Sequence, residues 1–141
     1  GIPDFARWPV RLELPGGGSI REFPLTTLSL GFFNLPLAGG AYLRFLPPAL
    51  FRWGFARLAA ANRPTVLYVH PWEIDPEQPR QAVSRRVRVN HYHNLDATEA
   101  RLAGLLEQFE FQSLGGVLEG LETTGRLPVY RFPEGSGRLS V

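Results

Sequence analysis

The stretch that decides the fold is VLYVHPWEID, residues 66–75. With the threonine before it, its first four residues form a continuous apolar and β-branched run, which is typical of a strand covered on both faces. His70 stands directly after this run, and Pro71 stiffens the chain that follows. We therefore expect a buried strand over residues 65–69, and then a loop as far as about Val83.

The chain before this strand predicts a helix. Pro47 and Pro48 suit a first helical turn, and the helix is expected over residues 49–61. Its buried side is expected to carry Leu50, Trp53, Phe55, Leu58 and Ala61. Residues 62–64, Asn-Arg-Pro, break it. A helix, a short break and a buried strand together predict an α/β unit.

The first third of the chain predicts β-structure with tight turns. Residues 10–14 alternate apolar and charged side chains, and residues 20–23 would return beside them after the PGGGS turn of residues 15–19. A further strand is expected over residues 25–30, and residues 34–36 are expected to break it. The α/β chain should thus begin with a β-rich segment.

Two more helices are expected towards the C-terminus. The first should begin at an N-cap on Asp96, with Glu99 completing a capping box, and run to about Glu110. Its buried side chains are expected to be Leu102, Leu105, Leu106 and Phe109. Ser113 is expected to cap a short final helix, and residues 122–141 form a tail that is expected to be partly disordered.

The composition excludes several classes of protein. The chain has 141 residues, which make one domain or a piece of a larger one, and no cysteine, which excludes disulfides and thiolate zinc sites. No apolar run approaches the roughly 20 residues of a transmembrane helix, so no membrane span is expected. The chain has no methionine, which predicts a processed piece or a fragment.

The charge does not predict a nucleic-acid partner. Fifteen basic residues, all arginine, stand against 13 acids, for a formal net charge of +2. A nucleic-acid binder normally clusters its positive charge, but here only Arg85, Arg86 and Arg88 lie close together. These three suit an anionic sugar or phosphate, and a solvated basic stretch is the alternative.

His70 is the leading candidate for chemistry. In parallel α/β proteins, reactive groups stand at the carboxyl ends of strands. Trp72 and Glu73 follow at once, and they predict an aromatic wall and a carboxylate beside the imidazole. Histidine gives or takes a proton near neutral pH. The alternative is a core histidine that only donates to a backbone carbonyl.

The other two histidines give a weaker signal. Residues 85–93, RRVRVNHYH, alternate, which predicts an edge strand or an extended loop. On a strand, His91 and His93 would share one face and help to bind a metal, although no third ligand is evident. Surface histidines are the alternative. The tryptophans offer faces for sugar rings, but Trp53 is expected in the core.

Four separated blocks of this sequence resemble one family. The first two blocks lie in REFPLTTLSLGFFNLPLAGGAYLRFLP (21–47). The third lies in VLYVHPWEIDPEQPR (66–80) and the fourth in RVNHYHNLDATEARLAGLLEQFEF (88–111). Their order is similar to the C-terminal region of NodB-type polysaccharide deacetylases, in the bacterial subgroup associated with exosortase and exopolysaccharide clusters. The resemblance covers residues 1–121 and leaves the tail unaccounted for.

The resemblance implies a fold and an activity. The fold would be the C-terminal portion of a deformed (β/α) barrel, with residues 65–69 as its last strand. The activity would be the metal-dependent hydrolysis of N-acetyl groups on amino-sugar polymers, with a divalent metal that is expected to be zinc. His70 matches the histidine that acts as general acid in that family.

The sequence also departs from the family pattern. It contains neither an Asp-Asp pair nor an H-x-x-x-H motif, so the resemblance implies that the general base and the metal ligands lie in a missing N-terminal half of the same protein. This chain alone is therefore expected to hold no metal and to be inactive. The residues that lie in the blocks and are candidates for lining the N-acetylated polysaccharide site are Tyr42, Arg44, Trp72, His91 and Tyr92.

A second function remains open at this point. A carbohydrate- or protein-binding module that never had catalytic partners would also lack the base and the ligands. The sequence does not decide between the cytoplasm and the cell envelope of a bacterium.

Overall fold

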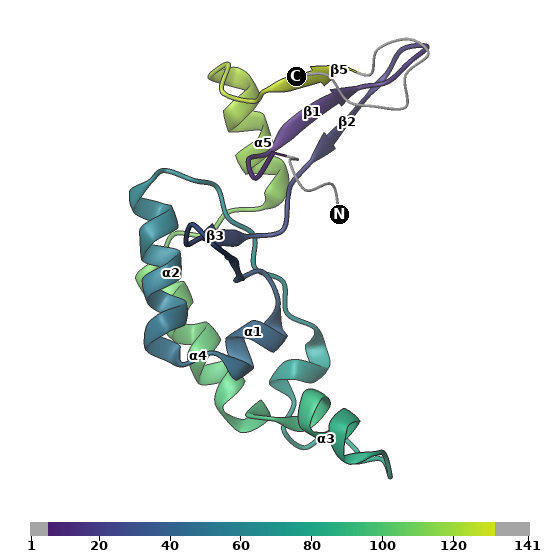
Figure 1. The fold of residues 1–141 in the computed structure, drawn as a ribbon, viewed down its shortest axis with the longest axis vertical. Coiled ribbons are helices and arrows are strands. Elements are labelled where there is room, and N and C mark those ends of the chain that lie inside the picture. The colour runs from purple at the N-terminus through teal and green to yellow at the C-terminus, as the bar shows by residue number, and fades with distance from the viewer. Residues whose placement is uncertain (1–5, 132–141) are drawn as a thin grey trace. The chain divides into compact units, whose positions relative to one another are not determined.

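The computed structural model describes residues 6–131, which form two compact units with a mixed α/β content (Figure 1). Of the described residues, one unit combines residues 6–24 with residues 112–131, and the other is residues 25–111. The predicted α/β class is confirmed at this level, and the strands of the described residues form one three-stranded and one two-stranded sheet without closing a barrel.

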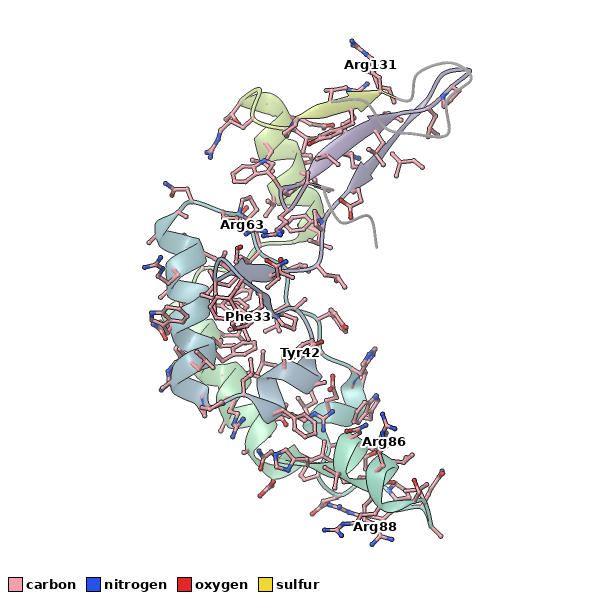
Figure 2. The ribbon with its side chains drawn as sticks, in the orientation of Figure 1. Phe33, Tyr42, Arg63, Arg86, Arg88 and Arg131 are labelled. Carbon is pink, nitrogen blue, oxygen red and sulfur yellow. The ribbon has the colours of Figure 1, made fainter. Side chains whose placement is uncertain are left out.

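The first unit is built on the predicted N-terminal hairpin, which is confirmed. Strands β1 (Val10–Glu13) and β2 (Ser19–Glu22) pair antiparallel. Three successive glycines in the turn adopt positive φ angles of 83°, 98° and 84° (Gly16, Gly17 and Gly18), which other residues rarely adopt. The third strand, β5 (Val129–Arg131), pairs parallel with β1, and Arg131 bonds Glu13 at 2.7 Å (Figure 2).

The helix of this unit, α5 (Leu114–Thr123), begins where the sequence predicts. The Ser113 hydroxyl accepts a hydrogen bond from the Gly116 amide at 3.1 Å, as an N-cap does. The boundary expected at residue 121 falls inside this helix, and β5 lies within the segment expected as a tail. The part of that tail from residue 132 onwards lies outside the described residues.

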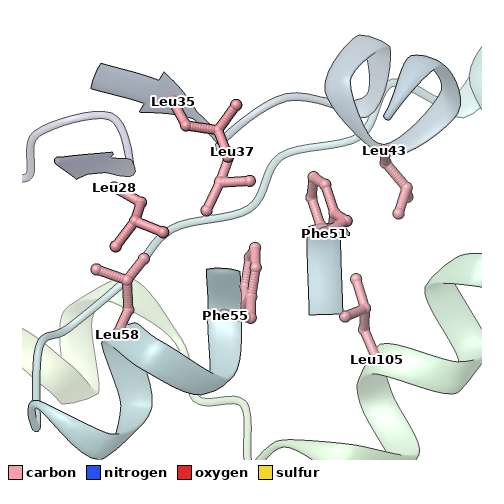
Figure 3. Close-up of a cluster of buried hydrophobic side chains, with 8 residues drawn as sticks. All are labelled: Leu28, Leu35, Leu37, Leu43, Phe51, Phe55, Leu58 and Leu105. Atoms are coloured by element: carbon pink, nitrogen blue, oxygen red, sulfur yellow. The ribbon is translucent and has the colours of Figure 1, made fainter. Parts of the chain in front are cut away.

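The second unit begins with a hairpin and continues as helices. Strands β3 (Thr27–Ser29) and β4 (Asn34–Pro36) pair antiparallel, so the prediction that residues 34–36 only break a strand is wrong. The helical elements are α1 (Gly40–Phe45), α2 (Pro48–Ala60), the 3₁₀ turn η1 (Pro71–Ile74), α3 (Arg85–Tyr92) and α4 (Leu95–Gln108). Their apolar side chains meet in one buried cluster, which consists of Leu28, Leu35, Leu37, Leu43, Phe51, Phe55, Leu58 and Leu105 (Figure 3).

Helix α2 forms as predicted, and its predicted buried side is confirmed in part. Phe55 and Leu58 are buried and Leu50 packs against the core, as expected. Phe51 and Gly54 are buried as well, whereas Ala61 follows the helix and is exposed. Trp53 is 43% exposed, so its expected place in the core is wrong. The reason is a close approach at Gly54, where a Cβ would lie 2.7 Å from a methyl carbon of Leu37. The helix therefore turns its glycine side to the core.

The predicted buried strand over residues 65–69 is wrong. The segment is extended but belongs to no sheet, and it makes one isolated parallel bridge, between Tyr68 and Gly39. The Thr26 hydroxyl takes the place of a strand partner, because it accepts from the Val66 amide at 2.7 Å and donates to the Val66 carbonyl at 2.8 Å. An apolar run shows that a segment is extended and partly covered, but not what satisfies its backbone.

The segment expected as an edge strand or an extended loop, residues 85–93, is mostly the helix α3, so both alternatives are wrong. Ser84 caps it, with its hydroxyl accepting from the Val87 amide. Val87 and Val89 are both about half exposed, at 49% and 47%, so their alternation with arginine marks no buried face. A period of two is informative only where one face is covered.

Helix α4 starts one residue before the predicted cap. The N-cap is Asn94, in the left-handed conformation with φ at 53°, and not Asp96. Leu105 is buried, and Leu102 and Phe109 pack against the core as predicted, but Leu106 is exposed. Within residues 6–131, no helix is long and apolar enough to cross a membrane.

The first unit predicts a pH dependence at Glu22. Burial raises the pKa of this carboxyl, and its Oε2 atom has no hydrogen-bond partner among residues 6–131. The folded state therefore holds the proton more tightly than the unfolded chain, and ionisation destabilises the fold as the pH rises through the raised pKa. Glu22→Gln should increase amide protection in β1 and β2 at pH 7, and this gain should vanish below about pH 4, near the pKa of an unfolded glutamate.

Glu13→Gln is the matched control in the same sheet. The hydrogen bond from Arg131 lowers the pKa of Glu13, so its ionised form is favoured on folding. Hydrogen exchange should therefore show no gain in protection for this variant at pH 7. A gain equal to that of Glu22→Gln would contradict the assignment.

Candidate active site around His70

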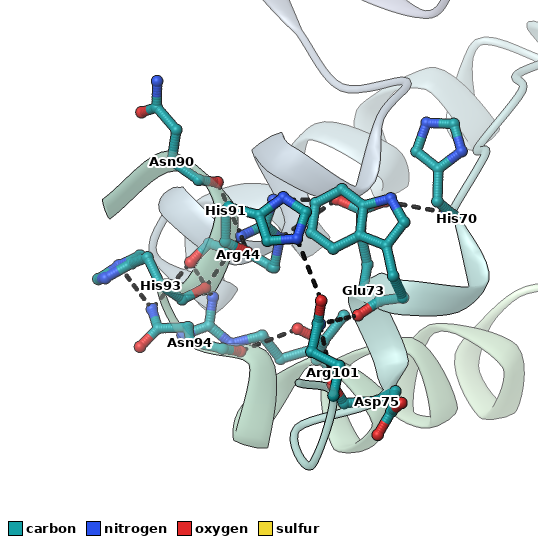
Figure 4. Close-up of polar contacts among 12 residues, drawn as sticks. Arg44, His70, Glu73, Asp75, Asn90, His91, His93, Asn94 and Arg101 are labelled. Atoms are coloured by element: carbon teal, nitrogen blue, oxygen red, sulfur yellow. Dashed lines mark hydrogen bonds and ion pairs between the residues drawn. The ribbon is translucent and has the colours of Figure 1, made fainter. Parts of the chain in front are cut away.

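His70 lies between the extended segment and η1, and both of its backbone groups are fixed. Its amide donates to Oε2 of Glu73 at 2.9 Å, and its carbonyl accepts from the Glu73 amide at 2.9 Å. Pro71 is the first residue of η1, where a missing N–H costs nothing. The imidazole is exposed, and Figure 4 shows it pointing away from the carboxylate. The predicted carboxylate therefore holds the backbone of His70 rather than its ring.

Glu73 is held in turn by a buried ion pair with Arg44. Oε1 of Glu73 accepts from Nε of Arg44 at 3.2 Å and from Nη2 at 3.1 Å, and each side chain is only 2% exposed. The remaining nitrogen, Nη1, donates to the carbonyls of Asn90, His91 and His93 at 3.1–3.2 Å. These carbonyls stand at the end of α3, where a helix leaves them unpaired. One guanidinium thus joins α1, η1 and α3.

Side chains of the α4 region fix the backbone of Arg44 and its neighbours. Nη1 of Arg101 donates to the carbonyls of Leu43 and Arg44 at 2.8 and 2.9 Å, and to that of Leu46 at 3.3 Å. The side-chain amide nitrogen of Asn94, Nδ2, donates to the Arg44 carbonyl at 2.9 Å. The unpaired carbonyls at the end of α1 are therefore satisfied by two side chains of the α4 region, which sets the direction in which Arg44 leaves α1.

Flat rings form a ladder beside the ion pair. The rings of Trp72 and His91 stack with centroids 4.0 Å apart and 11° between their planes, and the Arg44 guanidinium lies 5.1 Å from the Trp72 ring centre. Gln78 holds His91, because its Oε1 lies 3.1 Å from Nε2 of the imidazole. The His70 ring is parallel to Trp72 at 6.1 Å. Trp72 is thus already packed by protein groups.

The structure brings together most of the residues that the sequence selects. His70, Arg44, Trp72 and His91 form the contacts above, and Tyr92 meets the edge of His91 at 4.7 Å. Arg44 is buried and each of its three nitrogens donates to a protein group, so it holds the site together rather than facing a sugar. Tyr42 also lies on α1 and is exposed, and within residues 6–131 no hydrogen bond or ring contact joins its side chain to the other four.

Sequence reasoning missed the residues that position this site. The sequence marks neither Asn94 nor Arg101 as a site residue, since Asn94 precedes the helix expected from Asp96 and Arg101 lies within it. Glu73 is predicted beside the imidazole rather than beside Arg44. A local signal did exist for Glu73: a Pro at the first position of a turn and an acid at the third are typical of a capped start. Nothing in the sequence marks its pairing with Arg44, 29 residues away.

The described residues do not fit a catalytic metal. No three His, Asp or Glu side chains gather within residues 6–131. His91 and His93 do not share a face as a strand would require, because His91 stacks on Trp72 while His93 stacks on Phe45 at 4.6 Å. The chemistry that remains is that of an exposed imidazole on a fixed backbone, which suits proton transfer near neutral pH.

A glycine in α1 makes the buried ion pair possible, and this gives a prediction. A Cβ on Gly40 would overlap both carboxylate oxygens of Glu73. Gly40→Ala should therefore displace the carboxylate and lower the free energy of unfolding by about 1–3 kcal/mol. Urea denaturation of the full-length natural chain measures this, and exchange of the His70 amide should become faster.

Gly104→Ala is the control, because a Cβ at this position on α4 meets no atom within 4 Å. It should be neutral or stabilise the helix by up to about 1 kcal/mol. Equal losses in the two variants would show that the Gly40 contact has no special role.

Comparison with known proteins identifies one family. The family model described as "Domain of unknown function (DUF3473)" matches residues 1–119, so the chain belongs to this family. No curated protein and no solved structure matches the chain.

Proposed function

We propose that this chain, a member of the DUF3473 family, is the C-terminal part of a NodB-type polysaccharide deacetylase in which His70 is the general acid. The observation that supports this most is the way His70 is held: its ring is exposed, while its amide donates to the buried Glu73 carboxylate and its carbonyl accepts from the Glu73 backbone amide. A general acid needs this combination, because it must reach the substrate and keep its position.

The proposed step is the collapse of the tetrahedral intermediate in amide hydrolysis. An amine is a poor leaving group unless its nitrogen gains a proton. The His70 imidazolium gives its proton to that nitrogen as the C–N bond breaks, and this releases the sugar amine and acetate. The imidazole is left neutral and regains a proton from water.

The remaining parts of the proposed enzyme lie outside this sequence. The resemblance implies a divalent metal, expected to be zinc, and the described residues do not form its ligand set. We assign the metal ligands and the general base to other residues of the same protein. They would complete a deformed (β/α) barrel, in which the extended segment 65–69 takes the place of the last strand.

Exposed rings next to His70 and on α1 suit a sugar polymer. Tyr68 meets the edge of the His70 ring at 5.7 Å and is 43% exposed, and Tyr42 is 40% exposed. We propose Tyr42, Tyr68 and the outer parts of Trp72 and Tyr92 as contacts for the N-acetylated polysaccharide, with Arg44 and His91 as positioning residues.

The alternative is a non-catalytic carbohydrate- or protein-binding module. One observation favours it: Phe32 and Phe33 lie at the turn between β3 and β4, with Phe32 91% exposed and the ring centres 5.0 Å apart (Figure 2). An exposed aromatic pair is typical of a contact with another protein.

Replacing His70 separates these functions. In the full-length natural protein, His70→Ala should lower kcat on an N-acetylated amino-sugar polymer by about 10²- to 10⁴-fold, which is the usual loss for a general acid. KM, metal content and melting temperature should stay near wild type, because the imidazole is exposed and acts mainly in the transition state.

Tyr68→Phe is the matched control, since it keeps the ring that meets His70 and removes only the hydroxyl. Its kcat should remain near wild type. A His70→Ala protein with wild-type kcat per folded molecule would remove His70 from the mechanism and favour the binding module.

A further inference from the structure

Positive charge gathers on α3 and on the loop before it. Between Gln78 and Leu95 the sequence has no Asp or Glu, but it has four arginines, although the whole chain is nearly balanced. The four are exposed: Arg80, Arg85, Arg86 and Arg88. The ion pairs of residues 6–131 involve other arginines, so no described acid neutralises these four.

One tyrosine shares a side of α3 with two of these arginines and is in contact with a third. Residues three or four apart share a side of a helix, so Arg85, Arg88 and Tyr92 lie on the same side of α3. The Arg80 guanidinium lies over the Tyr92 ring, 4.8 Å from its centre. We call Arg80, Arg85, Arg88 and Tyr92 the basic face. Arg86 lies on the other side of the helix, away from Arg88 (Figure 2).

The basic face continues into the candidate active site through ring contacts. Tyr92 meets His91 at 4.7 Å, His91 stacks on Trp72 at 4.0 Å, and the ring of His70 lies parallel to Trp72 at 6.1 Å. A polymer chain that lies on the basic face is therefore in line with His70.

Helix α3 has no evident role in the core. None of its residues is buried, and neighbouring like charges on a helix destabilise it. Even so, its end is bound to the buried Arg44 by three carbonyls. The arginines of this helix are not paired with acids, although the helix is held firmly beside the candidate site. A ligand that binds to these charges would account for both features.

We propose that the basic face binds an anionic polysaccharide, one whose sugars carry carboxylate groups. This deepens the proposed function and rests on it, since it names the class of polymer presented to His70. The planar guanidinium forks of Arg80, Arg85 and Arg88 match carboxylates in charge and geometry. Tyr92 offers an apolar surface beside them for a sugar ring.

Nucleic acid is the other polyanion that arginines and a tyrosine ring could bind, and the structure favours it less. A nucleic-acid site usually spans a wide basic surface, whereas Glu77 and Asp96 bound the basic stretch in the sequence. Three arginines and one tyrosine suit a polymer with sparse charges.

Binding of an oligomer of galacturonic acid to the full-length natural protein tests the proposal by calorimetry. It should bind in low salt, weaken as salt is added, and bind more tightly than neutral dextran of the same length or single-stranded poly(dT). The double variant R85Q/R88Q should weaken binding by roughly five-fold or more, from two lost exposed charge contacts.

Arg86→Gln is the control, because it removes an exposed charge from the same helix on the other side. It should leave the affinity unchanged within about two-fold, as expected for a distant surface charge. Equal losses in R86Q and R85Q/R88Q, no binding of the galacturonate oligomer, or tighter binding of poly(dT) would each overturn the proposal. The assay needs no turnover, so its failure is distinct from a failure of the His70→Ala test.

Discussion

The structure of residues 25–111 depends on the buried ion pair between Arg44 and Glu73. Removing two charges from water costs several kcal/mol for each ion, and their attraction repays this only when the remaining hydrogen-bond positions are filled. Here each charged group has further partners: the second carboxylate oxygen accepts from the His70 amide, and the third guanidinium nitrogen donates to three carbonyls. The pair is therefore tied to one arrangement of backbone, because any other leaves a buried charge without partners.

This constraint carries the proposed functions as well as the fold. The carboxylate fixes the backbone from which the His70 ring projects, and the guanidinium fixes the end of α3, from which the basic face projects. The proposed general acid and the proposed polysaccharide-binding surface are thus both exposed, and both are held in place by the buried ion pair. Gly40 is part of the same support, because only a residue without a Cβ leaves room for the carboxylate.

The sequence predicts the elements whose signals are local. Pro48 at the start of α2, the Ser113 cap and the glycine turn after β1 each act within a few residues, and each is confirmed. Prediction from the sequence fails where the partner of a residue is distant along the chain. The run at residues 65–69 is held by the hydroxyl of Thr26, 40 residues away, and by backbone bonds of Tyr68 to Ala38 and Gly40, and an apolar pattern does not distinguish this from a strand in a sheet. For the candidate site, the resemblance selects His70 and its neighbours, but the pairing of Arg44 with Glu73 follows from tertiary structure alone.

A double-mutant cycle on Arg44 and Glu73 tests this account most directly. Urea unfolding of the full-length natural chain would compare R44M, E73Q, the double variant and Tyr42→Phe, an exposed control on the same helix. Each single variant should lose about 3 kcal/mol or more, since it leaves a buried charged partner. The double variant should lose less than the sum, with a coupling of about 2 kcal/mol, and Tyr42→Phe should be near neutral. Additive losses of under about 1 kcal/mol each, as for surface ion pairs, would contradict the account.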